Sequence, residues 1–533
     1  MKWILFTALI LIVVMLTFQW IKPRQQEQDM KKLQKAPSSK KVIWLMVDSM
    51  MAHAIDQGIE NGDLPALSYL TKHGHYQREV VSPFPTMSVT IDSSILTGTY
   101  PDQHRVPGLI WYDETEKRVV NYGTGLGEII RDGTNQFLKD AIIHLNQKHL
   151  NTQTPTLYED LADRGITSAS INGLIYRGKT DHTLSFPAWI SAPTSLPREL
   201  PVKGPDFLTF GAFANPLEGK VSLPDGITRS FGFSDPFPLE VTRYLIKKNR
   251  LPDFSFVYFS DADHSVHKKG PSDLSGLKKF DKELQSLLDS FGSWEKALNE
   301  AVWILSGDSG QTGLKSEKKE AVVRLDQHLK QYNQLAPGQK ATPETDLVLC
   351  VNERMAYVYT LNPSIREREL VDVLKGDSRI DLISWKENED VHVLHAGQDK
   401  KLQFRPGGPW QDPYRQKWEI RGDIETLDLQ EDPREKQLTY GEYPDPLSRL
   451  WGAHHSHPGR FLVVNVRPGY ELAIPSSPTH LGGGGHGSLH QTDSLIPCII
   501  TGTDQRPEHW RLVDFKDFLI RVLTQKPESP ETL

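Results

Sequence analysis

Short apolar runs that end on potential metal ligands recur along this chain, and they constrain its fold more than any other feature. They are residues 42–47 before Asp48, residues 254–259 before Asp261 and Asp263, residues 301–305 before Asp308, and a glycine run before His486. In a parallel α/β sheet, ligands gather beyond the carboxyl ends of the strands. Carboxylates and imidazoles placed there repeatedly predict a two-metal hydrolase that acts on phosphoryl groups.

Strand-like and helical patterns alternate along most of the chain. Further strand-like runs cover residues 168–171, 461–466 and 497–500. Helical patterns at residues 156–164 and 277–291 separate such runs, and Gly165 ends the first of these helices. This alternation predicts an α/β fold with a mostly parallel central sheet, right-handed crossovers and helices on both faces.

The length of 533 residues is compatible with one large α/β domain that carries insertions. We expect this domain over residues 42–525. The stretches that break the alternation are predicted insertions, at about residues 111–153, 185–237 and 315–445. Short strand-like runs at 347–351 and 355–360 predict that the largest insertion forms a subdomain with its own sheet. Residues 526–533 are expected to be a frayed tail.

Residues 1–21 are predicted to anchor the protein in a membrane. Residues 3–21 are apolar and uncharged over the length that spans a bilayer, and the run does not end in the small residues of a cleavage site. A polar stalk, residues 22–41, follows. We expect a single-pass membrane protein with an extracytoplasmic catalytic domain. Lysines and an arginine after the run favour the opposite orientation, although the positive-inside rule loses force for long translocated domains, so the orientation stays open.

Charge and cysteine content exclude some other classes of protein. The formal net charge of −7 gives no reason to expect a nucleic-acid partner. Cys350 and Cys498 lie far apart in the sequence without a second cysteine in a CxxC arrangement, so two buried thiols are expected rather than a disulfide. Nothing in the sequence indicates the oligomeric state.

Hydroxyl side chains gather at the start of a predicted helix that ends near Gly98. They belong to Thr86, Ser88 and Thr90. A hydroxyl near a helix N-terminus meets free backbone N–H groups that suit a phosphate, and a metal ion can ionise it without a histidine partner. Taken alone, such a residue is more often an ordinary helix cap.

Potential ligands crowd one short segment after the second apolar run. Asp263 and His267 lie one helical turn apart, and Asp261 and His264 occupy the same few residues. A surface loop could collect such residues, but their position directly after a buried strand favours a metal site.

The order and spacing of these motifs resemble the alkaline phosphatase superfamily, in particular its type I phosphodiesterase/nucleotide pyrophosphatase family. The matching positions are Asp48, the Phe84-Pro-Thr-Met-Ser88 segment with Thr97-Gly-Thr-Tyr-Pro101, the Asp263/His267 pair before Gly270-Pro271, Asp308, and His486-Gly487. The resemblance implies an alkaline phosphatase-like fold and two metal ions bridged by the nucleophile, Ser88. It implies zinc at Asp263, His267 and His486, and zinc, manganese or magnesium at Asp48, Ser88 and Asp308.

Three positions depart from the family pattern. Ser309 replaces a histidine ligand, so the second site could hold a harder ion on oxygen ligands, bind metal more weakly, or take His264 as a substitute. The family's phosphate-binding asparagine would fall at Ile91, which cannot donate a hydrogen bond, and the adjacent Asp92 carries the wrong charge. Val89 replaces an aromatic residue of nucleotide-cleaving members, which weakens the case for stacking on a nucleobase.

We therefore expect a metal-dependent phosphoester hydrolase, of phosphodiesterase or phosphatase type, that acts through a phosphoseryl intermediate at Ser88. One alternative is a sulfatase or phosphoglycol transferase on the same fold, although the segment after Ser88 lacks the C/S-x-P-x-R context of sulfatases. Another is a membrane-anchored binding protein that has lost turnover, which Ser309 and Ile91 would explain. The expected partners are a phosphoester substrate and the membrane, and the sequence leaves open whether monoesters, diesters or lipid-linked phosphates are cleaved.

Overall fold

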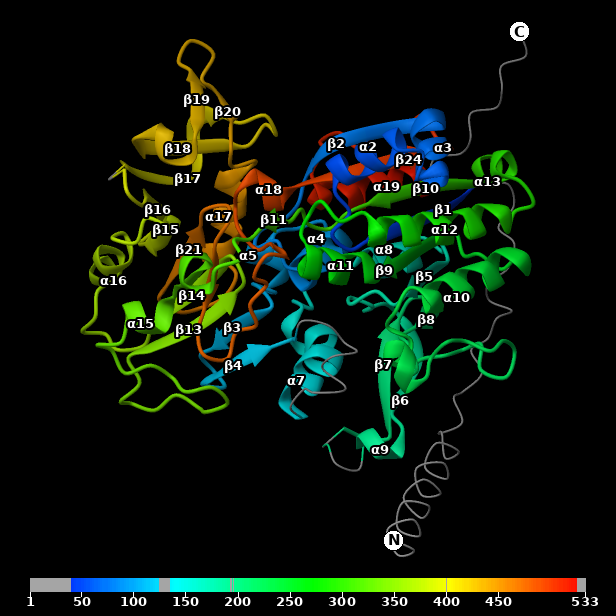
Figure 1. Ribbon diagram of the computed structural model, residues 1–533, viewed down its shortest axis with the longest axis horizontal. Coiled ribbons are helices and arrows are strands. Elements are labelled where there is room, and N and C mark those ends of the chain that lie inside the picture. Colours follow the sequence, from blue (N-terminus) through cyan, green and yellow to red (C-terminus); the bar gives the residue numbers. More distant parts are fainter. Residues whose placement is uncertain (1–39, 124–134, 192–193, 195, 399, 525–533) are drawn as a thin grey trace, which may run out of the picture.

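The computed structural model describes residues 40–123, 135–191, 194, 196–398 and 400–524 (Figure 1). The predicted anchor, nearly all of the predicted stalk and the predicted tail lie outside these ranges. Within the described ranges, no helix combines the length and the apolar character needed to cross a membrane.

A seven-stranded sheet in the order β2-β24-β10-β1-β9-β5-β8 forms the centre of the fold. Its strands are β1 (Lys41–Val47), β2 (Gly74–Val81), β5 (Ser168–Ile171), β8 (Phe207–Thr209), β9 (Phe254–Phe259), β10 (Ala301–Ser306) and β24 (Leu495–Thr501). Strand β1 pairs in parallel with β9 and β10, and β5 pairs in parallel with β8 and β9. The mostly parallel sheet is confirmed, but β24 runs antiparallel to both of its neighbours.

Both faces of this sheet are covered by helices. In β1, Val42, Trp44 and Met46 belong to one apolar cluster, and the alternate residues Ile43 and Leu45 belong to another. On the first face lie α4 (Ser88–Thr97), α8 (Leu157–Asp163) and α19 (Phe515–Thr524); on the second lie α2 (Ala52–Glu60), α3 (Pro65–His73), α10 (Pro236–Lys247), α12 (Ser275–Asp289) and α13 (Trp294–Glu300). Burial on both sides explains why the central strands are continuous apolar runs.

A second sheet of nine strands lies beside the first (Figure 1, green through yellow to orange). Its strands are β13 (Leu347–Asn352), β14 (Met355–Thr360), β15 (Ile380–Glu387), β16 (Asp390–His395), β17 (Lys400–Gln411), β18 (Lys417–Gly422), β19 (Leu429–Asp432), β20 (Gln437–Tyr440) and β21 (Phe461–Val466). Strand β21 runs antiparallel between β14 and β15. The alternation of strands and helices along the sequence predicts residues 461–466 in the central parallel sheet, and that prediction is wrong.

The remaining elements are short and fill the connections. They are α5 (Pro101–His104), β3 (Ile110–Asp113), β4 (Arg118–Asn121), α7 (Asn135–Lys139), η2 (Asp140–His149), β6 (Thr180–Ser185), α9 (Ala188–Ser191), β7 (Glu199–Gly204), η3 (Ile227–Gly232), α11 (Asp261–Lys269), β11 (Thr312–Gly313), α14 (Lys318–Ala321), β12 (Val322–Arg324), α15 (Leu325–His328), α16 (Glu367–Leu374), η4 (Ile424–Leu427), α17 (Pro446–His454), β22 (Glu471–Ala473), β23 (Gly484–Gly485), α18 (Gln491–Ser494) and η5 (Leu512–Asp514). Cys350 and Cys498 are buried free thiols in different sheets, as predicted.

Candidate metal centre

The N-terminus of α4 presents one hydroxyl to a large cavity. Ser88 is the first residue of α4, it is half-buried, and it lines the cavity. Thr86 and Thr90 are fully buried, and the Thr86 hydroxyl oxygen accepts the Gly487 N–H at 2.7 Å. Since the first N–H groups of a helix have no acceptor within it, this end of α4 can bind an anion beside Ser88.

Three aspartates follow three adjacent strands of the central sheet. Asp48 ends β1, Asp308 follows β10, and Asp263 lies in the first turn of α11, directly after β9. The Ser88 hydroxyl donates to Asp308 Oδ2 at 2.9 Å, and Asp308 Oδ1 accepts the Ser49 N–H at 2.9 Å. The sheet order therefore brings the predicted nucleophile and the predicted acidic ligands together at the carboxyl ends of the strands.

Of these aspartates, only Asp263 has a basic partner among the described residues, the imidazole of His267 at 3.2 Å. Among the described residues, no lysine or arginine forms an ion pair with any of the three. Burial, together with the carboxylates of Asp308 and Asp263, raises the pKa of Asp48 well above its usual value. Because neighbouring buried carboxylates repel one another, divalent cations fit this set of donors.

The two predicted histidine ligands have their ring orientation fixed by backbone carbonyls. His267 Nδ1 lies 2.9 Å from the Gly484 carbonyl oxygen, and His486 Nδ1 contacts the Thr86 carbonyl oxygen. A carbonyl only accepts, so each Nδ1 carries a proton, which leaves Nε2 as the ring nitrogen available to a metal. This arrangement is typical of histidines that bind metals.

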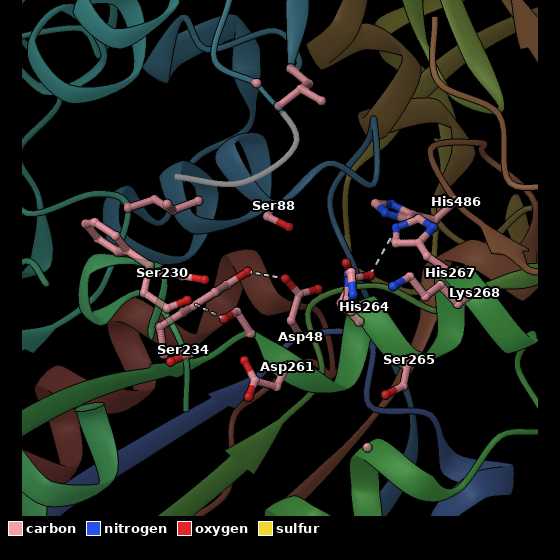
Figure 2. Close-up of a pocket in the computed structure, with 18 of the residues that line it drawn as sticks. Asp48, Ser88, Ser230, Ser234, Asp261, His264, Ser265, His267, Lys268 and His486 are labelled. Atoms are coloured by element: carbon pink, nitrogen blue, oxygen red, sulfur yellow. Dashed lines mark hydrogen bonds and ion pairs between the residues drawn. The ribbon is translucent and has the colours of Figure 1, made fainter. Parts of the chain in front are cut away.

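The Nε2 atoms converge with a carboxylate from α11. His267 Nε2 lies 3.2 Å from Asp263 Oδ1, and the ligand atoms of Asp263, His267 and His486 all lie within 4.8 Å of one another. Figure 2 shows the rings of His267 and His486 side by side. Burial alone would lower the pKa of His267, but the carboxylates of Asp263 and Glu353 raise it to about 10. An ion bound at this group would replace the proton of His267 as the positive charge.

The second predicted group offers only oxygen atoms, from Asp48, Ser88 and Asp308. Ser309 is fully buried, and its hydroxyl oxygen has no hydrogen-bond partner among the described residues. His264 lines the cavity but is exposed, and no hydrogen bond joins it to the described aspartates. Its role as a substitute ligand stays a prediction.

Several residues of the site have no motif in the sequence. Tyr258 OH donates to Asp48 Oδ2 at 2.5 Å. Gln311 Nε2 donates to Asp263 Oδ1 at 2.6 Å and to the Ser49 hydroxyl at 2.7 Å. Glu353 and His480 lie beside His267, from a hairpin of the second sheet and from a late loop. Tyr258 and Gln311 lie next to predicted ligands along the chain, so local inspection could have found them; Glu353 gave no such signal.

Ile91 lies in the protein core. It is completely buried in an apolar cluster, so the phosphate contact expected at its position is absent from the cavity wall. Asp92 is also completely buried, and burial, together with the charge of Asp308, raises its pKa well above the usual value. Every residue of α4 after Ser88 is buried, and only Val89 and Ser88 line the cavity.

The cavity has a volume of about 1330 Å³ and two kinds of lining. The ligand groups occupy one part, where Asp48 and Ser88 face the same space and His267 and His486 lie to one side (Figure 2). Another part of the lining is apolar, and its residues, which belong to or pack against one apolar cluster, are Met87, Val89, Leu109, Ala141, Leu145, Leu174 and Phe233. The cavity is larger than a phosphate group requires, so it can hold a ligand with a bulky apolar part.

Comparison with known proteins assigns the family. Residues 42–408 match the sequence profile of the type I phosphodiesterase/nucleotide pyrophosphatase family. The chain belongs to this family. This match confirms the resemblance carried by the motifs around Asp48, Ser88, Asp263 and Asp308, all of which lie inside the matched range.

Solved structures of the family share the fold of this chain. Murine ectonucleotide pyrophosphatase/phosphodiesterase 5, as an inactive threonine-to-alanine variant in complex with AMP, has a TM-score of 0.54 and 13% identity, over 92% of this chain and 96% of that chain. The human protein of the same name has a TM-score of 0.51 and 14% identity, over 91% and 96%. At these identities the similarity concerns the fold, which is alkaline phosphatase-like as predicted. A search of curated proteins gave no match.

Proposed function

We propose that this protein is a metal-dependent phosphoester hydrolase in which Ser88 attacks phosphorus and carries a phosphoryl group between two steps. Membership of the family supports the hydrolysis of phosphoesters. The observation that carries the proposal is the position of Ser88, which alone of the three hydroxyls at the start of α4 opens to the cavity and donates to Asp308 at 2.9 Å.

The donors on this chain fit two divalent ions. Asp263, His267 and His486 would hold one, and we propose zinc there; Asp48, Ser88 and Asp308 would hold the other, and we propose zinc, manganese or magnesium. When bound, such ions stabilise negative charge on the phosphoryl oxygens and make a hydroxyl or a water molecule acidic near neutral pH.

The residues of the chain then have distinct tasks. Asp308 Oδ2 accepts the hydrogen bond of the Ser88 hydroxyl and orients its oxygen. Ser88 Oγ gives up its proton to solvent, attacks phosphorus in line and forms an O–P bond, while the ester oxygen opposite departs with the electrons of its own bond to phosphorus and takes up a proton. A water molecule then loses a proton as it attacks the phosphoserine, and Ser88 Oγ leaves phosphorus and regains its proton, which releases phosphate or its monoester. Free N–H groups at the start of α4 bind the phosphoryl oxygens during both steps.

The cavity supports esters with a substantial apolar substituent as substrates. The apolar wall begins at Met87 and Val89, on either side of Ser88, so a group bound there would lie next to the phosphorus. Nucleotides are one class to test, since the murine relative binds AMP. Diesters and lipid-linked phosphates are the others.

The test compares the unaltered full-length protein, solubilised in detergent, with Ser88→Ala and Thr90→Ala. Para-nitrophenyl phosphate, bis(para-nitrophenyl) phosphate and para-nitrophenyl sulfate are assayed with zinc, manganese or magnesium. Ser88→Ala should lower turnover of a phosphoester by at least about 10³-fold, because the attacking atom is lost, while Thr90→Ala should stay near normal. Near-normal turnover by Ser88→Ala would contradict the proposal. If the unaltered protein hydrolysed only the sulfate, a sulfatase would be favoured, and if it bound metal without turnover, a binding protein would be favoured.

We also propose that residues 1–21 hold the protein in a membrane, with the catalytic domain outside the cytoplasm. The apolar, uncharged run at residues 3–21 supports this placement. Protease added to intact cells should digest a C-terminal tag on the full-length protein, and a tag that is protected until the cells are opened would contradict the orientation.

A further inference from the structure

A carboxylate of the second sheet reaches the histidines of the metal centre. Glu353 lies in the turn between β13 and β14, and its side chain is only 10% exposed. Its Oε1 lies 3.8 Å from the Nε2 atoms of both His267 and His486. Its Oε2 accepts the His486 N–H at 3.1 Å, which holds the carboxylate against the segment that carries this histidine.

The turn that presents Glu353 is fixed by the next residue. Arg354 is fully buried and donates to Asp493, to the Thr312 hydroxyl at 2.7 Å and to the Tyr470 carbonyl at 3.1 Å. Glu353 has a left-handed backbone conformation, with φ of +56°, and its carbonyl accepts the Leu472 N–H at 2.8 Å. The carboxylate is therefore placed in the site by the fold rather than by a flexible surface loop.

Imidazoles surround the Glu353 carboxylate. Among the described residues, the ionisable groups that face its carboxylate are the imidazoles of His267, His486 and His480. At 3.8 Å, the Nε2 atoms of His267 and His486 are too far from Glu353 Oε1 for hydrogen bonds. A buried carboxylate that faces two imidazole nitrogens at this distance forms a donor set that suits a divalent cation between the three groups.

We propose that Glu353 is a fourth protein ligand of the ion held by Asp263, His267 and His486. The proposal rests on the metal site of the proposed function and extends it to the inserted sheet. Zinc at about 2.0–2.1 Å from its ligands separates neighbouring ligand atoms by about 3.3 Å, so the 3.8 Å distances of Glu353 need only a small movement on binding.

A fourth ligand of this kind changes the chemistry of the ion. Catalytic zinc sites commonly have three protein ligands and one open position. Two carboxylates balance both charges of a divalent ion, which weakens its pull on a bound water molecule, and a mixed set of nitrogen and oxygen ligands also suits manganese. The same ligand would tie the second sheet to the central one through the metal.

The experiment measures metal binding by the full-length protein after the metals are removed with a chelator. Zinc affinity is determined by competition with a chromophoric chelator, and cobalt(II) is used as a probe because its visible bands report the number of ligands. The variants are Glu353→Ala, Glu353→Gln, His486→Ala and His480→Ala. Glu471→Gln is the matched control, since Glu471 is a buried glutamate of the same region that contacts His480. It belongs neither to the Asp263, His267 and His486 group nor to the His267, Glu353 and His480 group, in each of which the ligand atoms lie within 4.8 Å of one another.

We expect Glu353→Ala and Glu353→Gln to weaken zinc binding at least tenfold and to alter the cobalt bands, with Glu471→Gln unchanged. Glu353→Ala with unaltered affinity and unaltered bands would overturn the inference while leaving the metal site intact, provided that His486→Ala abolishes binding. Loss of zinc in His480→Ala but not in His486→Ala would also overturn it, because the ion would then lie on the other side of His267. If the unaltered protein bound no divalent ion, the proposed function itself would fail.

Discussion

Replacing Arg354 by methionine is expected to destabilise the protein more than a typical single substitution. Arg354 and Asp493 form an ion pair in which neither side chain is exposed. Arg354 also donates to the Thr312 and Ser488 hydroxyls and to two backbone carbonyls. Asp493 accepts the Ser488 N–H at 2.9 Å and the Thr312 hydroxyl at 2.7 Å. The substitution preserves apolar volume but removes every one of the donors of Arg354.

The magnitude follows from the burial of the pair. Removing one partner of a buried ion pair costs about 3–5 kcal/mol, because the other charge stays buried without compensation. The carbonyls that lose a donor add to this cost, although such terms are not additive. We therefore expect Arg354→Met to lower the free energy of unfolding by about 4 kcal/mol. A domain of this size gains entropy on unfolding of about 1 kcal/mol per kelvin, so the melting temperature should fall by about 4 °C.

The assay is thermal and urea unfolding of the full-length protein in the presence of a chelator. Arg368→Met is the matched control, since Arg368 is 70% exposed and pairs with Glu387 at 3.1 Å on the surface. That substitution should change the stability by less than about 1 kcal/mol. Asp493→Asn added to Arg354→Met should recover part of the loss, because the unpaired charge disappears. An effect of Arg354→Met as small as that of Arg368→Met would refute the reasoning.

Three further predictions concern the site. Tyr258→Phe, which removes the hydrogen bond to Asp48, should lower metal affinity or turnover about tenfold. Metal titration and steady-state kinetics measure the two quantities, and unchanged values would mean that this hydrogen bond does not support the metal site. Asp92→Asn should raise the melting temperature at pH 8 but not near pH 4. Burial raises the pKa of Asp92 in the folded state, so this carboxyl destabilises the fold only above its unfolded pKa, by about 1.4 kcal/mol per pH unit up to the folded pKa. A difference in melting temperature that does not depend on pH would contradict this. Ser309→His should raise zinc occupancy of the second group while costing about 1–3 kcal/mol of stability, since Ser309 is fully buried; if the unaltered protein already binds two zinc ions tightly, another residue supplies the missing ligand.

The sequence was most informative where structure and chemistry are both local. Strands β1, β9 and β10 are buried on both faces, so each is an uninterrupted apolar run, and each is followed within a few residues by an aspartate of the site. The pairing of Asp263 with His267 likewise follows from helical periodicity alone. These elements carry most of the predicted ligands.

Other features depend on long-range pairing, which local patterns do not encode. The apolar run of β21 is compatible with either sheet, and only its pairing with β14 and β15 places it in the second. Strand β24 carries no signal of its antiparallel direction. Ile91 lies three residues after the nucleophile, but α4 is buried along its whole length, so only its first residues meet the cavity. Glu353 comes from a hairpin turn whose sequence resembles any polar turn.

The departure at Ser309 and the proposed role of Glu353 have a joint consequence for charge. Asp48, Asp263, Asp308 and Glu353 would place four carboxylates around two divalent ions, so the metal centre would carry no net charge when His267 is neutral and the Ser88 hydroxyl keeps its proton. A neutral centre attracts the second negative charge of a phosphate monoester less than a positive centre does, whereas a diester has only one charge to accommodate. The chain should therefore favour diesters. Removing the carboxylate in Glu353→Gln should shift the ratio of kcat/KM values towards the monoester, measured with para-nitrophenyl phosphate and its bis ester at saturating metal. A ratio unaffected by that substitution would mean that the shape of the cavity, rather than the charge of the centre, decides between the two substrates.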